Sequence, residues 1–179
     1  MREISLHILD IVQNSVVAGA TRIEVLVDED VAADRLAVEI IDNGCGMSED
    51  FLEKVIDPFT TKRTTRKVGL GIPLFKNAAE STDGTFEIQS ELGKGTCIRA
   101  VFGYSHIDRQ PLGDMADTML GLFTSYEQID FVYRHKVGDK VFEVFTADLK
   151  TVLDGVSFTT PEVYLWLSEF LKEGESELN

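Results

Sequence analysis

The sequence predicts an α+β protein, and two observations support this prediction. The first hundred residues read helix, strand, strand, loop, helix, strand, strand. Hydrophobic residues make up 44% of the 179-residue chain, which is enough to fill a core and too many for a disordered chain. The pattern resets near residue 105, so we divide the chain into a first domain, 1–104, and a small C-terminal annex, 105–179.

The elements of the first domain each have a local signal. Apolar residues at helical spacing predict a helix over 4–17, which Gly19 ends. Two segments rich in β-branched residues, TRIEVLVDE and RLAVEIIDN, predict a pair of strands. A short helix is expected after Ser48, and a longer one from Gly71 to Ser81. The segments TFEIQSEL and CIRAVFGY, joined by the turn LGKGT, predict a closing hairpin.

The annex begins with the linker SHIDRQP, and we expect the rest of it to be a helix–hairpin–helix unit. The predicted helices are 112–123 and a segment after Pro161, and the hairpin joins FVYRHKV to VFEVFTA. So small a unit buries few residues, so it is expected to dock on the first domain or on a second subunit. The expected docking place is the far side of the first helix, with Leu6, Leu9 and Val17.

The charge of the chain limits its partners. With 17 basic and 31 acidic residues, the formal net charge is −14. We therefore expect neither nucleic acid nor an anionic membrane as a partner, since both attract basic surfaces. The annex alone has 14 acids and 6 bases, which favours a basic face on any protein that docks there.

Cysteine and histidine usage argues against a zinc site. Cys45 and Cys97 form no CxxC pair, and the chain has only three histidines. The opening MREISLHILDIVQNS is interrupted by polar residues, so we expect neither a signal peptide nor a membrane span. A reducing cytoplasm is the expected compartment.

The first helix has one narrow polar sector on a circumference that is otherwise mostly apolar. Asp10 and Asn14 stand one turn apart on this sector, so their side chains point the same way. The pattern also fits an ordinary exposed stripe. In a cleft, however, the Asp10 carboxylate could polarise a water, and the amide oxygen of Asn14 is a hard ligand suited to Mg²⁺.

A second candidate region begins where a predicted strand ends at Asp42. Gly44 and Gly46 follow it, with Met47 next. Glycines at such a place let the backbone approach a flat ligand or adopt positive φ. The carboxylate of Asp42 could accept a hydrogen bond from an exocyclic amine, although the same residues also fit a simple Asx turn.

A basic segment stands out in this acidic chain. Four of the 17 basic residues lie between Lys62 and Lys67, among threonines. The turn Gly69-Leu70-Gly71 then opens a helix, whose free amide groups and dipole favour an anion. We therefore interpret the segment as a phosphate lid. It matches neither the Walker loop nor the GxGxxG motif.

In this order, the motifs resemble those of the Bergerat-fold ATPases, the family of gyrase, Hsp90, histidine kinases and mismatch-repair proteins. Asp10 and Asn14 stand where that family has its N box, and DNGCGM is similar to its adenine-binding DxGxG motif. FTTK and GLGI are similar to histidine-kinase boxes, and GKGT to the closing GxGT hairpin. The resemblance covers residues 4–103 and implies a two-layer α/β sandwich with helices on one face of a mixed sheet.

The resemblance also implies roles around a bound Mg-ATP. Asp42 would accept from the adenine amino group, with Thr96 nearby through a water, and Asn14 would hold the Mg²⁺ ion. Lys62 or Arg63 would add positive charge from the lid. The implied catalytic residues are Asp10, Asn14 and Lys62. The implied nucleotide-binding residues are Asn14, Asp42, Gly44, Gly46, Met47, Phe59, Thr61, Lys62, Arg63, Gly69, Leu70, Gly71 and Thr96.

Within this family, the FTTK and GLGI motifs favour an ATP-dependent protein kinase, similar to histidine kinases, that acts on a separate partner protein. Hydrolytic members have Glu where this chain has Asp10, and the shorter side chain predicts weak hydrolysis. Neither His106 nor His135 stands in the sequence context of a phosphoacceptor. Two alternatives stay open, an anti-sigma-type serine/threonine kinase and a non-catalytic ATP sensor. A homodimer is left open as well.

Overall fold

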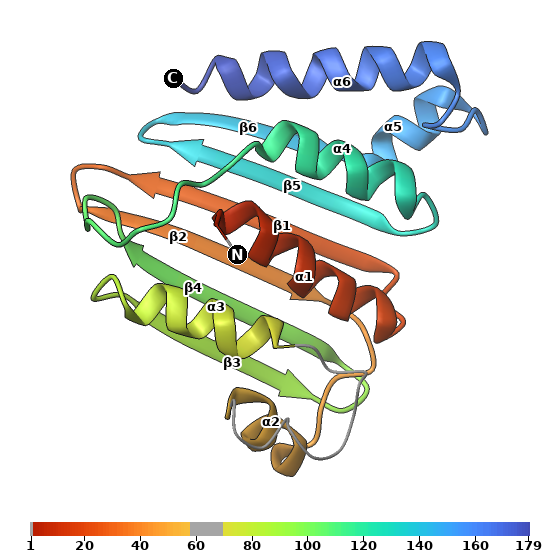
Figure 1. Ribbon diagram of the computed structural model, residues 1–179. Coiled ribbons are helices and arrows are strands. Elements are labelled where there is room, and N and C mark those ends of the chain that lie inside the picture. The colour runs from red at the N-terminus through yellow and green to blue at the C-terminus, as the bar shows by residue number, and fades with distance from the viewer. Residues whose placement is uncertain (1, 58–69) are drawn as a thin grey trace.

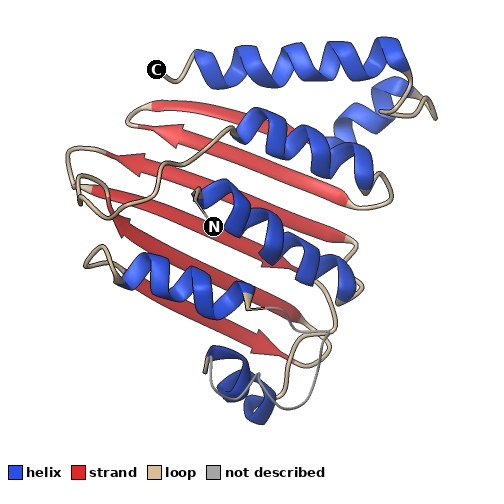
Figure 2. Ribbon diagram, in the orientation of Figure 1, coloured by secondary structure: helices blue, strands red, loops and turns tan. Residues whose placement is uncertain are grey.

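The computed structural model describes residues 2–57 and 70–179, which form two layers (Figure 1). This part of the chain contains one six-stranded sheet in the order β3-β4-β2-β1-β5-β6, with helices packed on one of its faces (Figure 2). The strands are β1 (Arg22–Asp30), β2 (Arg35–Asp42), β3 (Thr85–Glu91), β4 (Gly95–Gly103), β5 (Asp130–Val137) and β6 (Lys140–Phe145). The helices are α1 (Ile4–Val17), α2 (Glu49–Ile56), α3 (Gly71–Glu80), α4 (Met115–Ser125), α5 (Thr146–Leu153) and α6 (Pro161–Ser176). The predicted two-layer α+β sandwich with a mixed sheet is confirmed.

One element differs from the expected order. The segment VFEVFTA was expected to be strand throughout, but β6 ends at Phe145 and helix α5 begins at Thr146. The Thr146 hydroxyl accepts a hydrogen bond from the amide of Phe131 at 2.8 Å, which fixes the start of the helix beside β5. The threonine and alanine that looked like the end of a strand are therefore the first turn of a helix.

The C-terminal hairpin continues the sheet of the first hundred residues. Strand β5 pairs in parallel with β1, from Arg22 opposite Asp130 to Glu29 opposite Val137, and β6 forms the outer edge. The expected docking face on α1 was largely wrong, since Val17 is 79% exposed and Leu6 41%. Backbone pairing along β1 joins the annex to the rest, and α4 packs beside α1.

The linker at the start of the annex caps the N-terminus of α1. The first amide groups of a helix have no partner within it. Here the amide of Ile4 donates to the carbonyl of Pro111 at 3.0 Å, and that of Ser5 donates to Leu112 at 2.8 Å. One turn on, buried His7 contacts the Gln110 side chain at 3.0 Å between Nε2 and Oε1. Burial lowers the pKa of His7, which favours the neutral ring.

The core lies between the sheet and the helical layer. Helix α1 contributes side chains that are at most 2% exposed, because it is covered by the sheet below and by α3 and α4 beside it. Aromatic rings fill the space under α3, where Phe75 contacts Phe102 with ring centroids 5.9 Å apart. The core residues of α1 and the adjoining strands include Ile4, Ile8, Ile11, Val12, Ile23, Val25, Val27, Leu36, Val38 and Ile40. Within the described residues, no helix is both long and apolar enough to cross a bilayer.

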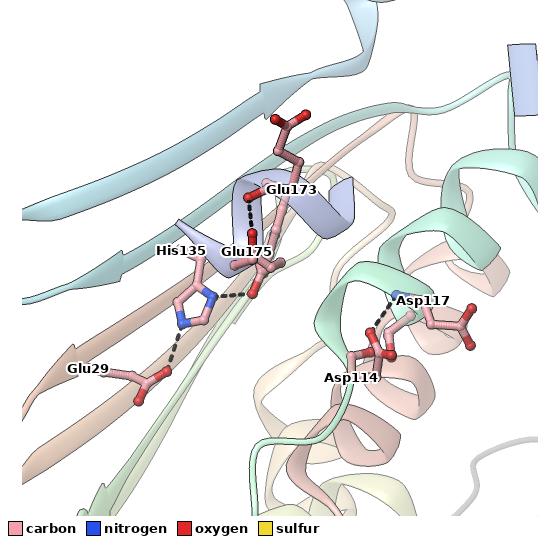
Figure 3. Close-up of polar contacts among 9 residues, drawn as sticks. Glu29, Asp114, Asp117, His135, Glu173 and Glu175 are labelled. Atoms are coloured by element: carbon pink, nitrogen blue, oxygen red, sulfur yellow. Dashed lines mark hydrogen bonds and ion pairs between the residues drawn. The ribbon is translucent and has the colours of Figure 1, made fainter. Parts of the chain in front are cut away.

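A buried group of polar side chains ties α6 to the sheet (Figure 3). The ring of His135 on β5 contacts Glu175 of α6 through Nδ1 and Glu29 of β1 through Nε2, both at 2.8 Å. The Tyr133 hydroxyl donates to Glu175 at 2.5 Å. Burial opposes the charged imidazolium, but the bonds to Glu175 and Glu29 outweigh it and raise the pKa of His135 to about 9.

We predict that this network makes the stability of the fold depend on pH. Because the folded state binds the His135 proton more tightly than the unfolded state, the stabilisation is complete below pH 6.5. It is then lost as the pH rises towards 9. The loss should be on the order of 3 kcal/mol, at about 1.4 kcal/mol for each unit of pKa. Urea unfolding between pH 6 and 9.5 measures it.

The matched variants are His135→Gln and His106→Gln. Replacing His135 should remove most of the decrease between pH 6.5 and 9, because glutamine does not titrate. Replacing His106, a linker residue with a 27% exposed side chain, should leave the decrease in place. An unchanged pH profile in His135→Gln would contradict the assignment.

Candidate functional site

A cavity of about 230 Å³ opens between α1, α2, the start of α3 and the ends of β2 and β4. Its walls are mostly apolar, with a few polar side chains reaching in from α1, β2 and β4. The lining residues are Ile11, Asn14, Ser15, Val17, Ala18, Asp42, Cys45, Gly46, Met47, Phe51, Val55, Ile72, Thr96 and Ile98. Five residues predicted from the motifs are among them, namely Asn14, Asp42, Gly46, Met47 and Thr96. An apolar cavity with few directed polar groups is the usual form of a small-molecule site.

The carboxylate of Asp42 is held in a fixed orientation on the cavity wall. One oxygen accepts from the hydroxyl of Ser15 at 2.7 Å, and the other accepts from the amide of Gly44 at 2.8 Å. A carboxylate accepts about four hydrogen bonds in all. Asp42 therefore has acceptor capacity left for a ligand donor.

A second polar chain runs beside Asp42. Thr96 lies opposite Asp42 in the antiparallel pairing of β2 and β4. The hydroxyl of Thr96 contacts that of Ser90 at 2.8 Å, and Ser90 accepts from the amide of Met47 at 2.8 Å. This chain joins the strand ends to the loop after β2, so the polar groups on this side of the cavity are held together.

The glycines of this loop are required by close backbone packing. Gly46 has φ +69°, and a Cβ atom there would lie 2.0 Å from the carbonyl oxygen of Glu91. A Cβ atom on Gly44 would lie 2.9 Å from the Cβ atom of Ala18. Any other residue at these two positions would force the loop away from α1 and from the β3–β4 turn. The loop therefore keeps the shape that places Asp42.

The other end of the site lies where α1 meets α3. A Cβ atom on Gly71, the first residue of α3, would lie 3.4 Å from Oδ2 of Asp10. The structure thus brings Asp10 against the N-terminus of α3, with Leu70 at the preceding cap position. The partial positive charge of a helix N-terminus favours anions. Asn14 lies one turn along α1 from Asp10, in the cavity wall.

The donor set fits a divalent ion that brings most of its own ligands. Among residues 2–57 and 70–179, no group of three or more His, Cys, Asp or Glu side chains is placed to hold a metal. Mg²⁺ commonly keeps its waters and binds through phosphates plus one or two protein oxygens. The amide oxygen of Asn14, in the cavity wall, suits that mode. The predicted lid residues lie outside the described residues: Phe59, Thr61, Lys62, Arg63 and Gly69.

Sequence reasoning missed most of the apolar wall and one polar residue, Ser15. The α1 part of the lining could have been found from the sequence. Ile11, Ser15 and Ala18 stand at i, i+4 and i+7, so they share a side of the helix next to Asn14. Phe51 has no such signal, because α2 reaches the cavity only through its tertiary position. The contact between Ser15 and Asp42 joins residues 27 apart, and no local pattern announces it.

Known proteins resemble this chain in sequence. Residues 2–105 match the family described as histidine kinase-, DNA gyrase B-, and HSP90-like ATPases. The sensor kinase CckA of Brucella abortus is 38% identical over 68 residues, which cover 37% of this chain and 7% of CckA. The autoinducer 2 sensor kinase/phosphatase LuxQ of Vibrio parahaemolyticus is 34% identical over 86 residues, covering 44% of this chain and 10% of LuxQ. The chain spans 16% or less of the first three curated relatives it matches.

Solved structures show the same architecture. The MutL ATPase domain of Aquifex aeolicus, complexed with ADP, has a TM-score of 0.51 at 14% identity and covers 86% of this chain and 68% of that domain. The N-terminal domain of a DNA repair protein has a TM-score of 0.53 at 14% identity, covering 81% and 52%. Both solved structures cover a larger share of this chain than residues 2–105 make up. The structural likeness therefore extends into the annex.

We predict that Ser15→Ala weakens nucleotide binding by about tenfold. The Ser15 hydroxyl bonds to a charged carboxylate, and such bonds contribute about 1.5–3 kcal/mol. Without it, Asp42 can rotate away from the ligand. Calorimetric titration with ADP measures the affinity. The control is Ser81→Ala, whose hydroxyl donates to the Ala78 carbonyl at the end of α3, away from the cavity lining. Equal affinities in the two variants would show that Ser15 has no role in orienting Asp42.

Proposed function

Since the chain belongs to the family of histidine kinase-, DNA gyrase B-, and HSP90-like ATPases, we propose that it binds Mg-ATP in the cavity beside α1 and transfers the γ-phosphate to a separate partner protein. Membership confirms the resemblance inferred from the motifs, and it implies ATP binding. The acceptor, the roles of individual residues and the transfer itself belong to the proposal.

The oriented carboxylate of Asp42 supports the proposal most directly. An adenine ring in the cavity would lie between apolar side chains such as Ile98 and Val55, which line the walls. Its amino group would donate to Asp42, which Ser15 and Gly44 already hold in place. Inside the cavity the amino group has no water to bond to. Its hydrogen bond to Asp42 therefore contributes more to binding than it would in solvent.

The junction of α1 and α3 supports the phosphate end of the proposal. The free amide groups at the start of α3, near Gly71, would donate to phosphate oxygens. Asn14 would hold a bound Mg²⁺ ion, whose charge would offset that of the phosphates during transfer. Lys62 and Arg63 would add positive charge. Phosphoryl transfer depends mainly on positioning and charge neutralisation, so these parts are chemically sufficient.

The histidines of the chain favour an acceptor on another protein. His7 is buried against Gln110 and stacks on Phe75 with ring centroids 5.4 Å apart. His135 is bound on both ring nitrogens by carboxylates. Neither ring can reach a γ-phosphate without breaking the core. His106 lies in the linker beside Asp83, at 3.6 Å.

Labelled ATP tests the transfer. The protein is incubated with γ-labelled ATP, Mg²⁺ and purified candidate partners, and label on a partner is the expected result. Label that is lost in acid and kept in alkali identifies phosphohistidine, and the reverse identifies phosphoserine or phosphothreonine. Asn14→Ala should abolish labelling, whereas Asn77→Ala, an exposed asparagine on α3, should not. Tight ATP binding without transfer to any partner would favour an ATP sensor instead.

We also predict that Asp10→Glu raises the rate of ATP hydrolysis by about tenfold or more, as expected for a better placed general base. The longer side chain brings the carboxylate closer to the position of an attacking water. Asp10→Asn, which has the length of aspartate and no basic group, should show no increase. Phosphate release at saturating ATP measures both. Because Gly71 lies close to Asp10, thermal unfolding of each variant verifies that the α1–α3 junction is intact. Equal rates in all three proteins would remove Asp10 from the hydrolytic step.

A further inference from the structure

Large apolar side chains are exposed along the segment in which α5 leads into α6. We call it the α5–α6 corner and define it by Val152, Val156, Tyr164, Leu165 and Trp166. These five belong to the large hydrophobic side chains that the fold leaves exposed, and they fall within 15 consecutive residues. Val152 is 83% exposed, Leu165 60% and Trp166 46%. Clusters of this kind on a folded protein mark interaction sites.

The corner is built on a rigid base. Trp166 stacks on Phe170 with ring centroids 5.3 Å apart and planes 8° apart, and Phe170 contacts Phe142 of β6 edge-on at 5.6 Å. Helix α6 packs so closely on β6 that a Cβ atom on Gly174 would overlap the ring of Phe142. A tryptophan held in one orientation binds a partner with little further loss of conformational entropy.

Acidic residues outnumber basic ones in the segment that contains the corner. Residues 146–179 contain seven acidic and two basic residues, a net charge of −5. Of the two basic residues, Lys150 is paired with Asp130 at 2.9 Å, and Lys172 is exposed on α6. Along the exposed side of α6, Glu162, Glu169 and Glu173 follow one another at helical spacing beside Leu165 and Trp166. Among the ion pairs of residues 2–57 and 70–179, none involves these three glutamates.

We propose that the α5–α6 corner binds a basic amphipathic helix presented by a partner protein. Such a helix has apolar side chains every three or four residues, which match Trp166, Leu165 and Val152. Lysines or arginines beside that apolar stripe match the glutamates of α6. Recognition requires both features, since the charge increases the rate of association and the apolar contact gives it affinity.

This surface is separate from the nucleotide cavity, and the proposal does not depend on phosphoryl transfer. Figure 1 shows α5 and α6 at the β6 edge of the sheet, whereas α2, which lines the cavity, lies by the opposite edge at β3. A second copy of the chain fits the corner poorly, because it would bring two acidic segments together. Anionic lipid is disfavoured by the same charge.

The single tryptophan of the chain, Trp166, reports binding directly. The probe is a synthetic 18-residue peptide of leucine and lysine with leucine at helical spacing. The matched peptide has the same composition in an order that spreads leucine around the helix. Titrated into the full chain, the first peptide should shift Trp166 emission to shorter wavelength and bind at least about tenfold more tightly than the second. Raised salt should weaken binding, as charge pairing requires.

Paired variants separate the apolar and the charged contributions. Leu165→Ser should weaken peptide binding about tenfold, while Ile107→Ser, which removes a 93% exposed side chain elsewhere, should have no effect. Glu169→Gln should weaken binding severalfold, while Glu53→Gln on α2 should not. Equal binding of the two peptides, or equal affinity in Leu165→Ser and Ile107→Ser, would overturn the proposal. So would sedimentation that shows a dimer which Leu165→Ser dissociates, because the occupant would then be a second copy.

Discussion

The placement of helix α1 is the constraint on which the rest of the structure depends. Its first amide groups are bonded to the linker at Pro111 and Leu112, its middle is buried on the sheet, and its last turns contact the loop after β2. There, the amide of Cys45 donates to the carbonyl of Ala18 at 2.9 Å. A helix fixed at both ends and along its length cannot rotate. Its polar sector therefore faces α3 and the cavity instead of solvent.

The fixed helix also determines how strongly the few polar groups of the cavity act. Surrounded by apolar side chains, the carboxylate of Asp42 is only partly solvated, so each hydrogen bond to it is strong and each missing one is costly. Ser15 supplies one of these bonds from α1, and Gly44 supplies the other from the loop. Because the donors come from different elements, the orientation of Asp42 depends on the packing of α1 against the sheet.

Local patterns predicted most of the first domain and five residues of the cavity lining, and long-range contacts account for what was missed. The helix over 4–17, the strand pairs and the glycine loop follow from periodicity and turn chemistry. The parallel pairing of β1 with β5 joins residues about 108 positions apart, and either strand alone reads as an ordinary amphipathic segment. His135 likewise looked like a lone strand histidine. Its charge depends on Glu29 and Glu175, which only the finished sheet brings together.

Strand β1 connects the two functional surfaces that we propose, the nucleotide cavity and the α5–α6 corner. Strand β1 pairs with β2, whose end contains Asp42, and with β5, which is tied to α6 through His135. A continuous ladder of backbone hydrogen bonds across these strands leaves no hinge between the nucleotide cavity and the α5–α6 corner. A partner bound at the corner would thus be held at a fixed distance from the cavity. Docking can raise the local concentration of an acceptor at the γ-phosphate only if the partner itself spans that distance.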